Sequence, residues 1–302
     1  MGNRKSNKRE TMTNYDMSKP WTKPRQSESH RLRERTAMQS AYSFQSYGIE
    51  PATSSIAFSP IYPAAFVNFT TQSVSPEKLR NKISELRDDE DGAYYGIVAT
   101  VTKPGATTMP ATVHAQRLLS FVLHADKIDE ATRLQMAALL NAMQARDLVS
   151  VEISLAGRSI GYIESAVFRL LNPKLPVGSH TLTHVSLCMS FASKKGLRTY
   201  LTSMSASYLV SLELQTNVDV KPIVLEALSS GHMLPRLQYL CLRKIKGLTP
   251  RELLDALRLR HDNGRTNPLH AEIDKDIDDD ICKDTRGLPI KLEKACIRMK
   301  FH

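Results

Sequence analysis

The sequence lacks the features that mark membrane-spanning and secreted proteins. None of its 302 residues belongs to an apolar run approaching the about 18 residues that a membrane-spanning helix requires. The N-terminus is polar and carries no apolar core of a secretory signal peptide. We therefore expect a protein of the cytoplasm or nucleus, unless an added lipid anchors it.

Cysteine is scarce as well. Cys188, Cys241, Cys282 and Cys296 lie far apart, and no two of them have the CxxC spacing of a zinc or redox motif. The histidines show no HxxxH or HExxH spacing. The acidic stretch EIDKDIDDDICKD lacks the glycine and the glutamate of a calcium-binding loop. We expect reduced thiols and neither a metal nor a cofactor.

The positive charge of the chain is concentrated at its start. The formal net charge is +10, and residues 1–40 hold ten Lys/Arg against four acids, which leaves +4 for the other 262 residues. An acidic membrane surface or a nucleic acid is therefore expected to bind, if at all, through residues 1–40.

The first six residues, MGNRKS, fit the M-G-x-x-x-[ST] signal for N-myristoylation at Gly2. Lys5, Lys8 and Arg9 would supply the electrostatic attachment that a single acyl chain needs to hold a membrane. Peripheral membrane association then follows if Gly2 is acylated. Without acylation the segment is an unmodified basic tail.

Composition divides the chain near residue 92. Residues 1–92 are rich in Ser, Thr, Pro and basic residues, which predicts a mostly disordered region. One short helix is expected near 75–88, where Ser75 can cap it and Pro76 suits its first turn. Residues 93–302 carry the regular apolar patterns and are expected to form the folded domain.

Five segments of that domain match L-x-x-φ-x-φ, where φ is apolar. Their first leucines are Leu118, Leu148, Leu182, Leu209 and Leu237, and a degraded sixth segment follows at Leu269, at spacings of 27 to 34 residues. Helical patterns fill the intervals, and the best, 249–260, starts with the capping box Thr249/Glu252. The repetition predicts an α/β leucine-rich-repeat solenoid, with parallel strands side by side and helices on the convex side.

The stretch PRLQYLCLRKIKGLTPRELLDALRLRHDNGRTNPL resembles the C-terminal repeats of fungal-type F-box/leucine-rich-repeat proteins. The resemblance implies a horseshoe that recruits a target protein to a ubiquitin ligase through a Skp-type adaptor. It covers the repeat region only: the repeat asparagine occurs once, at Asn217, and no segment clearly matches the F-box.

The motif GRSIG at 157–161 raises a different possibility. It lies between a strand-like and a helix-like run, which is the setting of a serine hydrolase's nucleophile elbow, with Ser159 as the nucleophile. His261, His270 and His302 are the available bases, but no HGGG-type oxyanion segment precedes the motif. A repeat loop with turn glycines explains the same residues, and we favour a non-enzymatic chain.

The residues between the apolar positions of each strand are expected to face away from the core, on the concave face. This row is small and polar, and Tyr239 and Arg243 are residue types that anchor protein partners. Glutamates in the row favour a partner with basic side chains, and no small-molecule substrate is expected. A merely solvated sheet face is the alternative. The candidate partner-binding residues are His124, Glu152, His184, Ser186, Glu213, Gln215, Tyr239 and Arg243.

Overall fold

A computed structural model describes most of the chain from residue 66 onward. All the described residues belong to one compact unit, Pro60–His302. Three of the candidate positions, Gly2, Ser159 and His302, lie outside them, as do Asn217 and the whole of residues 1–65. The described residues are 66–87, 94–105, 112–126, 128–157, 161–173, 180–203, 205–216, 218–230, 232–265 and 267–295.

A nine-stranded sheet forms the centre of this unit, in the order β1-β2-β4-β6-β7-β8-β9-β10-β11. Every neighbouring pair is parallel, so each strand lies next to the one that precedes it in the chain. Two short strands, β3 (Val113–His114) and β5 (Met143–Gln144), pair separately. The main strands are β1 (Phe66–Val74), β2 (Tyr94–Val101), β4 (Leu118–Ala125), β6 (Ser150–Leu155), β7 (His184–Cys188), β8 (Ser211–Gln215), β9 (Tyr239–Arg243), β10 (Leu269–Ile273) and β11 (Ile290–Lys294).

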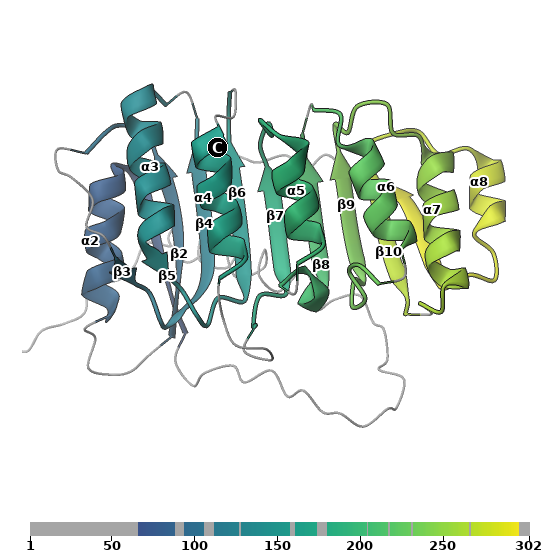
Figure 1. Cartoon of the computed structure of the whole chain (residues 1–302), viewed down its shortest axis with the longest axis horizontal. Coiled ribbons are helices and arrows are strands. Elements are labelled where there is room, and N and C mark those ends of the chain that lie inside the picture. Colours follow the sequence, from purple (N-terminus) through teal and green to yellow (C-terminus); the bar gives the residue numbers. More distant parts are fainter. Residues whose placement is uncertain are drawn as a thin grey trace, which may run out of the picture. The chain divides into compact units, whose positions relative to one another are not determined.

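The helices all lie along one face of this sheet (Figure 1). Side-chain caps start several of them: Asp129 accepts the N–H of Thr132, and Thr249 and Glu252 form the expected reciprocal capping box. None of the helices in the described ranges is long and apolar enough to cross a bilayer. They are α2 (Pro76–Arg87), α3 (Glu130–Ala142), α4 (Gly161–Leu171), α5 (Lys194–Leu201), the 3-10 helix η1 (Ala206–Tyr208), α6 (Lys221–Ser229), α7 (Pro250–Asp262) and α8 (Asp279–Asp284).

The five predicted strand segments lie side by side, as expected, and in register. The residues at the first φ position of L-x-x-φ-x-φ pair with one another from strand to strand across the sheet. The residues at the second φ position do the same. Both sets are buried against the helices and form one continuous core, as stacked units must. The first set is Phe121, Val151, Val185, Leu212 and Leu240, and the second is Leu123, Ile153, Leu187, Leu214 and Leu242.

The sheet begins upstream of residue 93, the expected start of the domain. Strand β1 (Phe66–Val74) pairs with β2, and the helix expected near 75–88 is present as α2. Leu79, Ile83 and Leu86 of α2 are buried in the same core as the repeat leucines. Strand β1 and helix α2 therefore form one further strand–helix unit on the same sheet.

Candidate interaction face of the sheet

The sheet face opposite the helices, here called the open face, carries the polar residues that alternate with the core positions in each strand. All eight predicted partner-binding residues lie on it, because each alternates with the buried core positions of its strand. The strand register aligns them in rows that run across the sheet. The middle row comprises Val122, Glu152, Ser186, Glu213, Cys241, Glu272 and Glu293.

Glu213 is the centre of the polar contacts on this face. Its Oε1 lies 3.3 Å from Nε of Arg243 on the next strand, and its Oε2 accepts a hydrogen bond of 3.2 Å from the Ser186 hydroxyl on the previous one. The side chains of Glu213 and Arg243 are only 25% and 15% exposed, so solvent screens the pair weakly. Three of the predicted residues are thus held together across strands β7, β8 and β9.

Cys241 differs from the other open-face residues because it is fully buried. Arg243 Nε lies 3.2 Å from its sulfur, and Glu213 and Glu272 flank it in the register. Burial raises the pKa of the Cys241 thiol to about 11. The thiol is therefore protonated at neutral pH and contributes packing rather than a reactive group.

The two predicted histidines of the open face, His124 and His184, take part in local contacts. His124 Nε2 lies 3.8 Å from Glu152 Oε1, and His184 Nδ1 lies 2.8 Å from the Thr183 hydroxyl. Burial lowers the pKa of His184, which favours its neutral form near pH 7. Gln215 is half-buried at the end of β8 and pairs with Arg243 in the register.

Strands β10 and β11 extend the face with residues that sequence reasoning missed. The ring of His270 lies 5.7 Å from that of Tyr239 at an interplanar angle of 42°. Its Nε2 is 3.5 Å from Glu272 and 3.3 Å from Glu293, and Lys291 lies 2.7 Å from Glu293. The alternation in LHAEI and IKLEK is the signal that could have revealed these residues.

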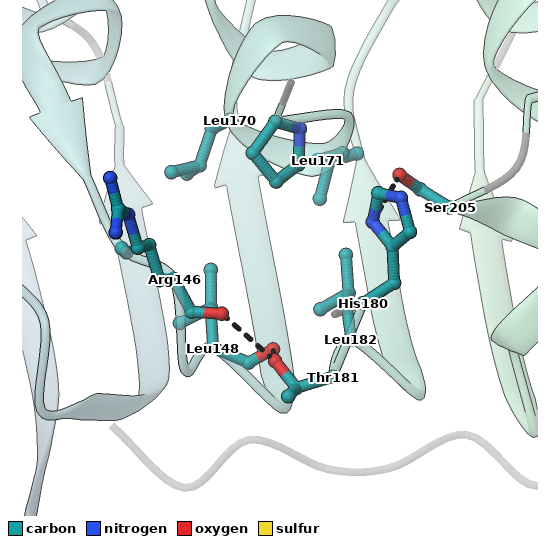
Figure 2. Close-up of a pocket in the computed structure, with 10 residues that line it drawn as sticks. Arg146, Leu148, Leu170, Leu171, His180, Thr181, Leu182 and Ser205 are labelled. Carbon is teal, nitrogen blue, oxygen red and sulfur yellow. Dashed lines mark hydrogen bonds between the residues drawn. The ribbon is translucent and has the colours of Figure 1, made fainter. Parts of the chain in front are cut away.

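A pocket lies near the N-terminal ends of strands β6 and β7. Figure 2 shows Arg146 and His180 on opposite sides of it. The Ser205 hydroxyl donates to Asn172 Oδ1 at 2.8 Å and lies 3.2 Å from His180 Nδ1. Ser205 is fully buried, so its hydroxyl cannot reach a substrate and instead links the loops around the pocket.

The surroundings of the GRSIG motif match part of the hydrolase hypothesis. Strand β6 ends at Leu155 and helix α4 starts at Gly161, so the expected strand–turn–helix is present, although Ser159 itself is not among the described residues. His270 lies on β10, four strands from β6, or about 19 Å at the usual strand spacing. His261 lies on α7, which α5 and α6 separate from α4, the helix that follows β6 (Figure 1). The structure therefore brings neither base to the end of β6.

Comparison with known proteins gave no match, whether with family models, with curated proteins or with solved structures. In the part of the chain that the structure describes, no three His, Cys, Asp or Glu side chains are grouped as metal ligands.

Proposed function

We propose that the chain is a non-enzymatic protein-interaction module, built as a leucine-rich-repeat solenoid, whose open face binds a protein partner. The observation that carries this proposal is the register of polar side chains from β4 to β11 on a face that no described helix covers. Parallel strands stacked in chain order, with the helices on one side of the sheet, are what such a solenoid requires.

The centre of the face suits a partner that carries basic and hydrogen-bonding side chains. Glu152, Glu213 and Glu272 present carboxylates along one row, while Tyr239 and Arg243 are of the types that dominate binding energy at protein interfaces. Glu213 fixes the guanidinium of Arg243 in place, so less side-chain freedom is lost on binding.

The resemblance of residues 234–270 to F-box/leucine-rich-repeat proteins extends the proposal to substrate recognition for a ubiquitin ligase. A purified Skp-type adaptor should then co-purify with the full-length chain. Absence of the adaptor from the complex would remove the ligase role and leave the interaction face intact as a proposal.

Substitutions on the two faces of the sheet test the binding role. Tyr239→Ala and Arg243→Ala should each weaken capture of the partner that the wild-type chain retains, by ten-fold or more if they are central to the interface. Arg169→Ala, an exposed arginine of α4 on the helical side, is the matched control and should leave capture unchanged. Equal effects of Arg243→Ala and Arg169→Ala would contradict the proposed face.

The second candidate is a serine hydrolase that uses Ser159, favoured by the strand–turn–helix context and by Gly157, whose φ of 97° permits a tight turn. A fluorophosphonate probe should label Ser159 in that case, and Ser159→Ala should abolish the labelling. Absence of labelling in the folded wild-type chain supports the interaction module.

A further inference from the structure

We infer that the turns leading into strands β6 to β9 bind single-stranded nucleic acid. The site, here called the strand-entry edge, consists of Arg146, His180, Tyr208 and Arg236, one from each turn. It lies at the N-terminal ends of the strands, where Arg146 and His180 line the pocket described above (Figure 2). The inference concerns a different part of the molecule from the open face and does not rest on the proposed function.

Three planar side chains of the strand-entry edge stack on one another. The guanidinium carbon of Arg236 lies 5.0 Å from the centre of the Tyr208 ring, and the Tyr208 ring lies 5.7 Å from that of His180 at an interplanar angle of 37°. Their turns lead into β9, β8 and β7, which are neighbours in the sheet. The stack therefore runs across the strands, from one structural unit to the next.

The stack is accessible to a planar ligand. Arg236 is exposed, and Tyr208 and His180 are partly exposed. Unpaired bases of nucleic acids stack on aromatic side chains and on arginine guanidinium planes, and such stacking tolerates any base sequence. The side chains of the stack are therefore of the types that bind the bases of a single strand.

Buried polar contacts hold the stack in place. The hydroxyl of the fully buried Ser205 lies 3.2 Å from Nδ1 of His180. The guanidinium of Arg260, which is 4% exposed, donates to the carbonyl of Leu234 at 2.6 Å, two residues before Arg236. A site that is ordered before binding loses less conformational freedom when the ligand arrives.

The charge of the same turns suits a polyanion. The four residues that precede each of strands β4, β6, β7, β8 and β9 include three arginines and one acid, namely Arg117, Arg146, Arg236 and Asp147. Arg146 and Arg236 are both exposed, and in the part of the chain that the structure describes neither guanidinium forms an ion pair with a carboxylate. Both can therefore donate to phosphate oxygens.

The two arginines are spaced for a short stretch of nucleic acid. Arg146 and Arg236 lie three strand steps apart, or about 14 Å at the usual spacing. Successive phosphates of a stacked strand are about 3.4 Å apart along its axis, so this distance corresponds to about four nucleotides. An acidic peptide would match the charge, but its carboxylates have no planar bases to place on the stack. The combination of stack and arginines favours nucleic acid.

A fluorescent oligouridine of about 12 nucleotides tests the inference on the full-length chain. In fluorescence anisotropy, Arg146→Gln with Arg236→Gln should raise the dissociation constant about ten-fold or more. The dependence of the logarithm of affinity on the logarithm of salt concentration should become shallower by about 1.4, because each lost phosphate contact removes about 0.7.

The matched control removes the same charge from the opposite ends of the strands. Lys195 lies in the first turn of α5 and Lys246 follows β9, and both are exposed. Lys195→Gln with Lys246→Gln should change neither the affinity nor its salt dependence. Equal effects of the two pairs of substitutions, or no binding of the oligouridine to the wild-type chain, would overturn the inference.

Substitutions of Tyr208 separate stacking from charge. Tyr208→Leu removes the planar ring and should raise the dissociation constant about five-fold or more. Tyr208→Phe keeps the ring and should stay within about two-fold of the wild type. Equal losses of affinity in the two variants would show that the ring is not a stacking surface and would overturn the inference.

An oligoglutamate with the same number of negative charges identifies the class of ligand. It should displace the labelled oligouridine at least about ten-fold less effectively than unlabelled oligouridine does, because it cannot stack. Equal displacement would assign the strand-entry edge to an acidic protein segment and overturn the inference. Tyr239→Ala and Arg243→Ala on the open face should leave oligouridine binding unchanged, so this inference and the proposed function fail separately. A loss of oligouridine binding in these two variants would move the contact to the open face and overturn the inference.

Discussion

Arg243 Nε lies 3.3 Å from Glu213 Oε1, and this contact joins strands β9 and β8 on the open face. The two residues pair across the parallel register as Glu213↔Cys241 and Gln215↔Arg243, so the arginine reaches back diagonally over the buried thiol. The pair orders the side chain that we propose as the main anchor for a partner, and it also holds two neighbouring units together.

A double-mutant cycle should show that this pair is energetically coupled. Glu213→Ala and Arg243→Ala, singly and together, should give a coupling of about 1 kcal/mol in urea unfolding, because both side chains are mostly buried. The control pair on the helical side, Lys194 and Asp219 at 3.0 Å, is 49% and 47% exposed, so solvent screens it and its coupling should be smaller. A coupling at Glu213–Arg243 no larger than the control would contradict the ordered anchor.

Gly196 in helix α5 should resist replacement by alanine. A Cβ there would lie 2.6 Å from Glu164 Oε1 and 2.8 Å from the Phe168 ring, while Glu164 is buried and accepts the N–H groups of Ala192 and Ser193. The clash is expected to outweigh the gain in helix propensity of about 1 kcal/mol, so Gly196→Ala should destabilise by about 1–3 kcal/mol.

Gly161, the first residue of α4, is the matched control for that substitution. Nothing lies within 4 Å of a Cβ built on it, so Gly161→Ala should be neutral or slightly stabilising. Denaturant midpoints of the two variants measure the difference. Similar effects of both substitutions would mean that α5 packs less closely against α4 than the structure shows.

The core of the fold was predictable because its signal is periodic. Strands β4, β6, β7, β8 and β9 share L-x-x-φ-x-φ, and only parallel stacking buries that pattern in every unit at once. The two edges were less predictable. Strand β1 follows a proline-interrupted stretch and has no leading leucine. In β10, Ala271 and Ile273 pair with Leu240 and Leu242 of β9, so the position of the leading leucine is occupied by Pro268.

The open face was predictable as a set of positions but not as a set of contacts. Alternation alone places Glu213, Tyr239 and Arg243 on one face. It does not show that Arg243 turns toward Glu213 rather than toward Asp274, nor that Cys241 is covered, because both depend on side-chain conformations chosen between neighbouring strands. The contribution of His270 was missed because its strand departs from the repeat pattern.

The capping box of α7 should contribute about 1 kcal/mol to the free energy of unfolding. The Thr249 hydroxyl accepts the N–H of Glu252, and the Glu252 carboxylate accepts the N–H of Thr249 while also pairing with Lys221 at 2.9 Å. Thr249→Ala removes the first contact and should lower the free energy of unfolding by about 0.5–2 kcal/mol. Thr249→Ser keeps the oxygen and should cost much less. Equal losses of stability for Thr249→Ala and Thr249→Ser, in thermal or urea unfolding, would show that the hydroxyl does not stabilise the helix.

Cys241 should make the protein less stable as the pH rises above 9. Its pKa is raised from 9.0 to about 11 by burial, so between these values the thiol ionises in the unfolded chain before it ionises in the folded one. The free energy of unfolding is fully retained below pH 9 and should fall by up to about 1.4 kcal/mol per pH unit as the pH rises toward 11. Urea unfolding under reducing conditions at pH 8, 9 and 10 measures the slope.

Replacement of the Cys241 thiol separates its contribution to the pH dependence of stability from that of the tyrosines. Tyr95, whose pKa is raised to about 12, adds its own alkaline slope above pH 10 in every variant. Cys241→Ala should flatten the decline in the free energy of unfolding between pH 9 and 10, whatever its effect on stability at pH 8. The control Cys282→Ala removes an exposed thiol of α8 and should leave the slope the same as in the wild type. Parallel pH profiles for wild type and Cys241→Ala would mean that the thiol is in contact with water, and that Arg243 does not cover it.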